Sequence, residues 1–349
     1  MKKIFLMAYA RKNLGDDLFI KILLERYPKH NFYMMIDDSK YLSMFEEKYN
    51  NLHILKGKDT DISLNNINIE AYDAYIYIGG SIFMEGGIVY NLSNTFYNFT
   101  KKCREYNRPF FYISSNYGPY KTKEYFELSR KNFNIVTDIC FRDKYSYNLF
   151  KDIQTVRYAP DYAFTYSMFN NEKIPNSVGI TIIDLGVRNN LKNKENEYVN
   201  MLVNNINNYL KNGKKVYLFT FCAHEEDERT LNIILSKVNN NNVFDIRYNG
   251  NIDEFIKKYS QIEYMICSRF HAIILSMLAK QNIQVVSYSN KINNVIQDLE
   301  LGIPIINLNE INAKTYLNLD GFSTIDNEKL NNIIYDSYRQ EEKIREILE

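Results

Sequence analysis

An alternation of short apolar segments with segments of helical periodicity constrains the fold of this chain more than any other feature. In the first half, runs rich in β-branched and aromatic residues occupy 4–8, 32–36, 52–55, 74–78, 110–113 and 139–141. Segments whose apolar residues recur at helical spacing, such as 89–106 and 123–133, lie between them. Strands that alternate with helices in this way predict parallel sheets covered by helices on both faces.

The same alternation repeats in the second half of the chain. After Asp161, apolar runs occupy 178–183, 216–221, 243–246, 264–267, 285–288 and 303–306. A polar stretch without periodicity, 167–177, is the best candidate for a linker, and 349 residues are more than most single cores accommodate. We therefore predict an α/β protein with two doubly wound, Rossmann-like domains facing a cleft, over 1–165 and 166–325. The charged amphipathic segment 326–349 is expected to form a terminal helix.

Composition excludes several classes of protein. The net charge of +1 gives no reason to expect nucleic acid as a partner. No stretch is long and apolar enough to span a membrane, and the first apolar run is interpreted as a strand because it leads directly into Arg11 and Lys12. The cysteines form no CxxC pair, which favours buried free thiols in a reducing cytoplasm. They are Cys103, Cys140, Cys222 and Cys267.

Ligands of open α/β sheets bind beyond the carboxyl ends of the strands, so the loops that follow strands are the most informative. Gly79, Gly80 and Ser81 follow the run 74–78. Paired glycines let the backbone approach an anionic ligand closely and offer N–H groups to it. The spacing matches neither a dinucleotide fingerprint nor a phosphate-binding loop, and a structural tight turn is an equal alternative.

Two further loops have a structural explanation that is at least as good as a functional one. Asn13, Gly15 and Asp16 follow the first strand and open a helix, where Asn and Asp are ordinary capping residues. The acidic run that begins at His224 could suggest a metal site. It also lies where a helix is expected to start, and acidic residues suit that end of the helix dipole, so we favour the helix start.

The segment 264–288 reads as a strand, a helix and a second strand, with Arg269 and His271 at the first joint. Ser268 is a suitable N-cap, which would place Arg269 and His271 in the first turn of the helix. Free backbone N–H groups and the helix dipole favour an anion there, and an arginine adds bidentate recognition of carboxylate or phosphate. His271 lies off the apolar stripe of the helix. The functional interpretation is therefore favoured over a structural one.

Taken together, these motifs resemble the polysaccharide pyruvyl transferase family over about residues 4–302. The resemblance includes N-x-G-D from Asn13, Gly79–Gly80, Y-G-P at 117–119, R-D-x-x-S from Arg142 to Ser146 and P-D at 160–161. It continues with H-x-x-D from His224 to Asp227 and S-R-x-H from Ser268 to His271, followed by a strand and Lys291. Each motif is weak alone, but their order and spacing make the match specific.

The resemblance implies a fold similar to GT-B glycosyltransferases and transfer of pyruvate from phosphoenolpyruvate to a sugar, with a cyclic ketal as product. The first domain would be the acceptor side and the second the donor side. Arg142, Arg269 and Lys291 would bind the two anionic groups of the donor, and His271 would protonate its C3 carbon. Asp16 would orient or deprotonate an acceptor hydroxyl. The remaining expected substrate-binding residues are Ser268, Asn13, Gly15, Gly79, Gly80 and Ser81.

The reaction implied by the resemblance requires no metal and no cofactor beyond the donor substrate. The expected partners are phosphoenolpyruvate and a glycan precursor on a lipid or nucleotide carrier, and a lipid-linked acceptor would bring the protein to the membrane surface. Two alternatives remain at this stage. A GT-B glycosyltransferase would use Arg269 and Lys291 to hold the diphosphate of a nucleotide sugar. A non-catalytic sugar-binding module would fit the Tyr-rich loops. The acceptor sugar and the oligomeric state stay open.

Overall fold

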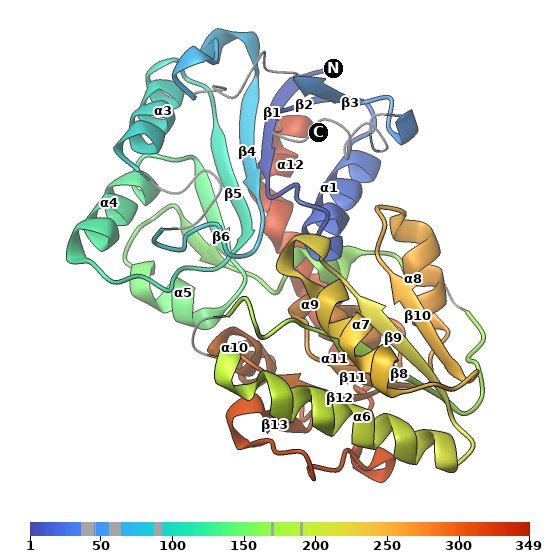
Figure 1. The fold of residues 1–349 in the computed structure, drawn as a ribbon. Helices are drawn as coiled ribbons and strands as arrows, with labels where there is room; N and C mark the ends of the chain where they lie inside the picture. The colour runs from blue at the N-terminus through green and yellow to red at the C-terminus, as the bar shows by residue number, and fades with distance from the viewer. Residues whose placement is uncertain (36–44, 46, 56–63, 87–92, 169–170, 189–190) are drawn as a thin grey trace. The chain divides into compact units, whose positions relative to one another are not determined.

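The structure is a computed structural model that describes residues 1–35, 45, 47–55, 64–86, 93–168, 171–188 and 191–349. The chain divides into two compact units, shown in Figure 1. Unit 1 comprises Met1–Arg11, Asp16–Thr165 and Ile333–Glu349, and unit 2 comprises Lys12–Gly15 and Tyr166–Asn332. The chain therefore passes from the first unit to the second between Thr165 and Tyr166.

Unit 1 is built on a seven-stranded sheet in the order β3-β2-β1-β4-β5-β6-β7, in which every neighbouring pair is parallel. Its strands are β1 (Lys3–Ala8), β2 (Asn31–Met35), β3 (Leu52–Leu55), β4 (Ala74–Ile78), β5 (Phe110–Ser115), β6 (Asp138–Phe141) and β7 (Val156–Tyr158). The strand order reverses between β1 and β4, which is the position of the ligand crevice in doubly wound sheets.

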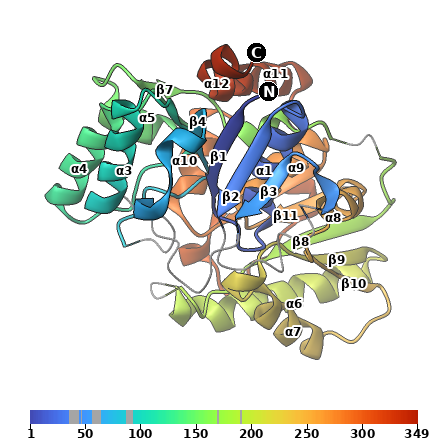
Figure 2. The same cartoon turned by 90° about the horizontal axis from the view of Figure 1, so that it is seen from above.

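Helices cover both faces of this sheet (Figure 2). They are α1 (Leu14–Arg26), α3 (Asn94–Glu105), α4 (Lys123–Phe133) and α5 (Lys144–Phe150). Alternate residues of the strands, such as Phe5, Tyr75 and Tyr112, form an aromatic core with Phe99 of α3 and Phe133 of α4. Their neighbours along each strand point to the opposite face, because side chains alternate across a sheet.

The C-terminal segment belongs to unit 1 from Ile333 onward and is not the single helix expected over 326–349. It forms α11 (Asn327–Ser337), the 3₁₀ turn η8 (Tyr338–Glu341) and α12 (Glu342–Leu348). The turn brings Gln340 into the core, where its side chain accepts from Ser114 N–H at 2.8 Å and donates to the Ala159 carbonyl at 2.7 Å. The interruption therefore supplies hydrogen bonds to the end of β5, which a straight helix would not reach. Leu348 in turn accepts at its carbonyl from the His30 ring at 2.8 Å.

Unit 2 contains a six-stranded parallel sheet in the order β10-β9-β8-β11-β12-β13. Its strands are β8 (Ser177–Ile182), β9 (Lys215–Thr220), β10 (Val243–Arg247), β11 (Tyr264–Cys267), β12 (Asn282–Ser287) and β13 (Ile305–Asn307). Counted from β8, this is again the Rossmann order, and it reverses between β8 and β11. The two parallel-sheet α/β domains confirm the predicted fold class.

The helices of unit 2 are α6 (Glu195–Lys211), α7 (Asp227–Lys237), α8 (Ile252–Ser260), α9 (Phe270–Leu278) and α10 (Asn290–Asp298). On one face of the sheet, Ile180 and Leu218 pack with Leu202 of α6 and Ile234 of α7. On the other face, Phe219 contacts the rings of α8. Short 3₁₀ turns complete the chain at η1 (Leu64–Asn66), η2 (Ile69–Ala71), η3 (Tyr162–Thr165), η4 (Lys192–Lys194), η5 (Ala223–Glu225), η6 (Leu308–Glu310) and η7 (Leu319–Gly321).

Each predicted strand is present, and the structure adds one that the pattern missed. β7 is only three residues long, and its centre is Arg157, which bonds to Asp138 of β6 at 2.6 and 2.8 Å. The expected linker 167–177 includes residues 169–170, which lie outside the described residues. The described part is anchored to unit 2, because Lys173 Nζ donates to the carbonyls of Ser260 and Ala279 at 2.5 and 2.7 Å.

Candidate functional site

The reversal of strand order in unit 2 places two arginines in neighbouring loops. Arg188 follows β8, and Arg269 follows β11, which pairs directly with β8. The helices that leave these strands, α6 and α9, cover opposite faces of the sheet. Loops that diverge in this way form the usual ligand position of a doubly wound domain.

Arg269 occupies the N-cap position of α9, so the helix begins one residue later than the sequence predicts. Its backbone is extended, with φ −114° and ψ 141°, and the helix begins at Phe270. Ser268 therefore does not cap the helix. It is buried one residue further out, and its backbone N–H donates to Thr181 Oγ1 at 2.6 Å.

The guanidinium of Arg269 is bound by two carboxylates of the protein itself. Its Nη1 donates to Glu225 Oε2 at 2.5 Å, and its Nη2 makes a closer contact with Asp227 Oδ1. The same Oε2 atom of Glu225 also accepts from Arg188 Nη2. The Arg188 guanidinium in turn lies over the ring of Tyr288, 4.5 Å from its centroid. We call Arg188, Glu225, Asp227 and Arg269 the arginine–carboxylate cluster.

The two carboxylates of this cluster differ electrostatically. Burial acts to raise the pKa of Glu225, but Arg269 and Arg188 outweigh it and lower the value to about 2. Burial raises the pKa of Asp227 to about 6, with Glu225 adding to the shift and Arg269 opposing it. Glu225 is therefore ionised throughout the physiological range, whereas Asp227 takes up a proton in mildly acidic solution.

His271 lies in the first turn of α9 against the first loop of the chain. A Cβ atom built on Gly15 would lie 1.8 Å from His271 Nδ1, so only glycine allows this approach. Asn13 Oδ1 accepts from Gly15 N–H at 3.1 Å, and Leu14 N–H donates to the Phe221 carbonyl at 3.0 Å. The bond to Phe221 attaches Lys12–Gly15 to unit 2, although the sequence predicted these residues in the first domain.

Lys291 is in the first turn of α10, at the end of β12. Since β12 pairs with β11, Lys291 and Arg269 follow neighbouring strands of one sheet. Unit 2 therefore contains most of the predicted donor-side residues, along with two residues from the first loop of the chain. The members are Asn13, Gly15, Ser268, Arg269, His271 and Lys291.

Arg142 of unit 1 is held in a closed arrangement. Its Nη1 donates to Asp161 Oδ2 at 2.9 Å, and its Nη2 donates to Asn116 Oδ1 at 2.8 Å. A Cβ atom on Gly80 would lie 2.5 Å from Arg142 Nη2, so the glycine provides the space for the guanidinium. The N–H of Gly79 donates to the Ile113 carbonyl at 3.4 Å rather than being offered to a ligand. In this structure Gly80 serves the packing of Arg142, and Gly79 bonds to the neighbouring strand β5.

Ser81 and Asp16 are the other expected site residues in unit 1. Ser81 is exposed, and its hydroxyl bonds to Asn116 Oδ1 at 3.2 Å. Asp16 is partly buried in the first turn of α1, and its Oδ1 lies 3.9 Å from the position that a Cβ on Gly79 would take. Both follow the strands β1 and β4, where the order of this sheet reverses.

The R-D-x-x-S motif caps a helix. Asp143 is the N-cap of α5, and its Oδ1 accepts from Ser146 N–H at 2.8 Å. Its Oδ2 accepts from the Ser146 hydroxyl at 2.8 Å, and that hydroxyl accepts from Tyr117 N–H at 2.7 Å. The bonds connect two loops at the end of the sheet, which accounts for the spacing of these residues in structural terms.

Sequence reasoning missed Arg188 and Glu225. Arg188 follows the first strand of the second sheet, and this position beside the reversal of strand order was the available signal. Glu225 was interpreted only as part of an acidic helix start. In the structure the helix α7 begins at Asp227, so Asp227 is the acidic residue at the helix start. Glu225 is the last residue of η5, and its carboxylate contacts both Arg188 and Arg269.

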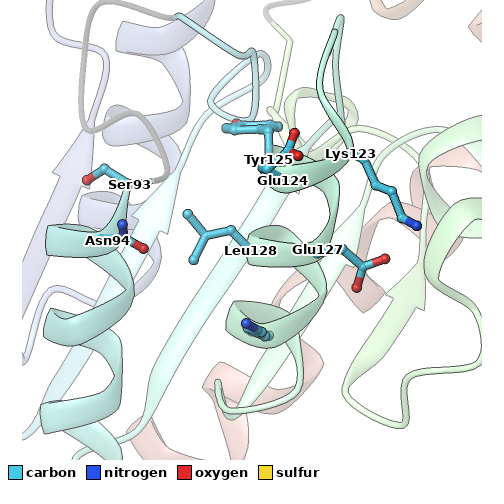
Figure 3. A pocket seen from close by; sticks show the side chains of 8 residues that line it. Ser93, Asn94, Lys123, Glu124, Tyr125, Glu127 and Leu128 are labelled. Atoms are coloured by element: carbon cyan, nitrogen blue, oxygen red, sulfur yellow. The ribbon is translucent and has the colours of Figure 1, made fainter.

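Unit 1 also has a pocket between the first turns of α3 and α4, shown in Figure 3. Its described lining residues are mostly charged or polar side chains of the helix surfaces, and none of them belongs to the motifs above. They are Ser93, Asn94, Lys123, Glu124, Tyr125, Glu127, Leu128 and Lys131. Its composition gives no indication of a ligand.

Two further properties concern only the part of the chain that the structure describes. Within it, no helix combines the length and the apolar character needed to cross a membrane. Among the same residues, no three His, Cys, Asp or Glu side chains come together in a way that could hold a metal ion.

Solved structures with a similar fold include several proteins whose titles name a UDP-sugar. A UDP-GlcNAc 2-epimerase from Methanocaldococcus jannaschii matches with a TM-score of 0.61 and 11% identity, covering 99% of this chain and 98% of that one. A putative UDP-N-acetylglucosamine 2-epimerase from Listeria monocytogenes gives 0.57 at 11% identity, covering 97% and 88%. An Arabidopsis thaliana protein complexed with UDP-L-rhamnose gives 0.55 at 9% identity, covering 99% of each chain. At these identities the likeness shows the fold alone, which is GT-B-like.

Comparison with curated protein sequences finds no match to the chain. The family model described as polysaccharide pyruvyl transferase matches residues 13–290, which is most of the sequence. The matched range starts at Asn13 and ends just before Lys291. It includes Gly15, Arg188, the cluster carboxylates and His271. The chain therefore belongs to the polysaccharide pyruvyl transferase family.

Proposed function

We propose that the protein transfers pyruvate from phosphoenolpyruvate to a sugar of a polysaccharide or glycan precursor, with a cyclic pyruvate ketal as the product. Membership of the family supports polysaccharide pyruvylation. One observation carries the finer proposal. At the start of α9, Arg269 shares a carboxylate with Arg188, while His271, two residues later, lies against Gly15. Permanent positive charge and a titratable imidazole thus meet at one end of a parallel sheet.

Phosphoenolpyruvate carries a carboxylate and a phosphate, so its site needs at least two cationic groups. Arg188, Arg269 and Lys291 are the residues that we assign to this task. Arg269 is almost fully buried, which strengthens its electrostatic effect because water screens it little. Arg188 keeps 21% of its side-chain surface exposed, so it can approach a ligand from the solvent side.

His271 is the residue that we assign to proton transfer. Protonation at C3 of the donor turns the enol carbon C2 into an oxocarbenium-like centre, and a sugar hydroxyl then forms a bond to C2. Departure of inorganic phosphate breaks the C2–O bond to the donor oxygen. A second hydroxyl of the same sugar closes the ketal, and both hydroxyl protons are released. An imidazole is suited to the first step because its ordinary pKa of about 6.5 is close to neutral pH.

For the acceptor we propose Asp16 and Ser81 of unit 1. Both lie at the reversal of strand order in the first sheet, and Asp16 is the residue that would orient or deprotonate a hydroxyl. Arg142 is assigned a different role from the one expected from the sequence. Since it is bonded to Asp161 and Asn116, we propose that it positions the Gly79–Gly80 loop instead of binding the donor.

A glycosyltransferase that uses a nucleotide sugar is the second candidate. The specific observation in its favour is that the similar solved structures are described as UDP-sugar proteins. In that case Arg188, Arg269 and Lys291 would hold a diphosphate. The family match and the imidazole beside the arginines favour the pyruvyl transferase.

The two functions differ in what they do with a donor in heavy water. Incubation with phosphoenolpyruvate and a panel of glycan acceptors should release phosphate and place one solvent deuterium in the methyl group of the ketal. Nucleotide sugars should give no transfer. Glycosyl transfer from a UDP-sugar, without phosphate release from phosphoenolpyruvate under the same conditions, would overturn the proposal.

A further inference from the structure

The exposed face of the arginine–carboxylate cluster is formed by Glu225. One oxygen, Oε2, accepts from both Arg269 Nη1 and Arg188 Nη2. A carboxylate oxygen shared by two guanidinium groups is the contact that the carboxylate or phosphate of an anionic substrate makes with paired arginines. Glu225 thus occupies the position that an anionic ligand of Arg188 and Arg269 requires.

Asp227, the other carboxylate of the cluster, is fixed in place. Its side chain is fully buried, and its Oδ2 accepts from the backbone N–H groups of Phe221 and Cys222 at 3.2 and 3.0 Å. Its second oxygen holds Arg269. Removing Asp227 from the arginine would leave a buried charge without compensation, which is costly.

Glu225 differs from Asp227 in each of these respects. Its side chain is 30% exposed, compared with 0% for Asp227. In the described part of the chain, no backbone N–H donates to its carboxylate. It stands at the end of the short turn η5, and the next residue, Glu226, has a left-handed backbone with φ +58°. The carboxylate can therefore leave the arginines by side-chain rotation and regain water without disturbing a strand or a helix.

Withdrawal of Glu225 makes the site more positive, which favours binding of an anion. With Glu225 in place, two guanidiniums face two carboxylates. With Glu225 turned outward, Asp227 alone opposes Arg188 and Arg269, and the net charge between the arginines becomes positive. The arginines are then held by Asp227 and Tyr288 but open to a ligand.

We propose that Glu225 is an internal competitor for the anionic donor: its carboxylate occupies the space between Arg188 and Arg269 in the free protein and withdraws when the donor binds. The inference rests on the proposed function for the identity of the donor, but not for the competition itself. It makes Glu225 a residue that sets donor affinity. It also assists release of the phosphate product, because the returning carboxylate takes its place.

The test compares Glu225→Gln with Asp227→Asn, using inorganic phosphate as the probe in titration calorimetry. Glu225→Gln should bind phosphate about tenfold or more tightly than the unaltered protein, because a minor open state is commonly populated at about 10% or less. Asp227→Asn should tighten phosphate binding by no more than about two- to fivefold, because Asp227 lies on the buried side of Arg269 and does not occupy the position between the two arginines. Glu226→Gln, in the same turn, removes one exposed charge and should leave phosphate affinity unchanged.

Weaker or unchanged phosphate binding by Glu225→Gln would overturn the proposal and show that Glu225 positions the arginines. Glu225→Ala provides a second variant, with the same expected tightening, if the glutamine variant has a lower melting temperature than the unaltered protein. Phosphate binding tests the competition by Glu225 without depending on the identity of the donor. Failure of the proposed function would appear separately, as absence of phosphoenolpyruvate binding and turnover in a protein whose phosphate affinity still responds to Glu225.

Discussion

Arg142 of unit 1 and Arg269 of unit 2 follow parallel strands and meet a buried aspartate, yet their surroundings differ. Arg142 bonds to Asp161 and Asn116, and both Arg142 and its aspartate are almost entirely buried. Arg269 bonds to Asp227 on the buried side and to Glu225 on the exposed side. All the partners named for Arg142 are buried side chains. The outer partner of Arg269, Glu225, is a carboxylate that is partly exposed to solvent.

We therefore use the partner on the outer side of each arginine, rather than the arginine itself, to distinguish a structural contact from a candidate binding position. A neutral amide or buried aspartate completes a structural contact. A partly exposed carboxylate shared with a second arginine, as at Glu225, is the contact for which we propose replacement by another anion. The four predictions that follow test this distinction between Arg142 as structural and Arg269, with its neighbour His271, as functional.

The largest effect is expected at His271. His271→Gln keeps a hydrogen-bonding side chain but cannot supply a proton, so turnover should fall by about 10²–10⁴-fold. Binding of phosphoenolpyruvate should persist, because Arg188, Arg269 and Lys291 remain. Single-turnover kinetics and calorimetry measure the two quantities separately. Near-normal turnover in the glutamine variant would show that His271 is a packing residue and would contradict the functional role proposed for the start of α9.

Arg142→Ala should act on stability instead. It leaves the carboxylate of Asp161 buried without its cation, and breaking a buried pair in this way costs about 3–5 kcal/mol. The measurement is the melting temperature of the purified variant. Arg130→Ala is the matched control, since Arg130 pairs with Asp152 on the surface of the same unit and should shift the melting temperature little. Equal shifts for the two variants would contradict the structural role of Arg142.

The periodicity of the sequence was sufficient to predict the two parallel α/β domains, because long alternating runs report directly on which residues are buried. It failed for β7, where three residues around a charged Arg157 carry no pattern. It also failed for the C-terminal segment, where the bonds of Gln340 to residues about 180–226 positions away interrupt the helix. Such bonds depend on tertiary packing, which a local pattern does not report.

The sequence was sufficient to select candidate site residues, but not to predict which side chains they contact. Arg269 and His271 stood out because a cation and an imidazole flank the start of a helix. The pairing of Arg269 with Asp227, 42 residues earlier in the chain, joins the loops that follow β9 and β11, the two strands on either side of β8. Arg142 carries the same charge and follows a strand in the same way. Its contacts with Asp161, Asn116 and Gly80, which the sequence does not report, distinguish it.

Two glycine substitutions give a sharper version of the comparison. Gly80→Ala places a Cβ 2.5 Å from Arg142 Nη2 and should lower the free energy of unfolding by about 1–3 kcal/mol, the usual cost of overpacking. Gly15→Ala places a Cβ 1.8 Å from His271 Nδ1 and should displace the imidazole. A displacement of about 1 Å at a reacting group can reduce turnover by about 10²-fold.

Melting temperature and turnover should be measured for both glycine variants. Gly321→Ala is the control, because nothing lies within 4 Å of its added Cβ. If the two roles are correct, the Gly80→Ala variant has a lower melting temperature with nearly normal turnover. The Gly15→Ala variant then has reduced turnover with a nearly normal melting temperature. The reverse pattern would contradict both the structural role of Arg142 and the functional role of the site at Arg269 and His271.

The smallest effect is expected in the pH dependence of anion binding. Burial raises the pKa of Asp227 to about 6, so below that pH its carboxylate is neutralised and opposes Arg269 less. Sulfate, whose charge is constant from pH 5 to 7.5, should therefore bind more tightly at the lower pH. We expect a change of about two- to fivefold, typical of a partly screened interaction of about 0.5–1 kcal/mol.

The sulfate measurement belongs in the His271→Gln variant, because the imidazole would otherwise titrate in the same range. Glu225, with a pKa of about 2, stays charged throughout this range. Adding Asp227→Asn should abolish the pH dependence. The same raised pKa implies that the contribution of Asp227 to stability is lost as pH rises from its ordinary value of 3.8 through about 6. If sulfate affinity varies equally with and without Asp227, the titrating group lies outside the arginine–carboxylate cluster, and Asp227 belongs with Asp161 as a purely structural partner.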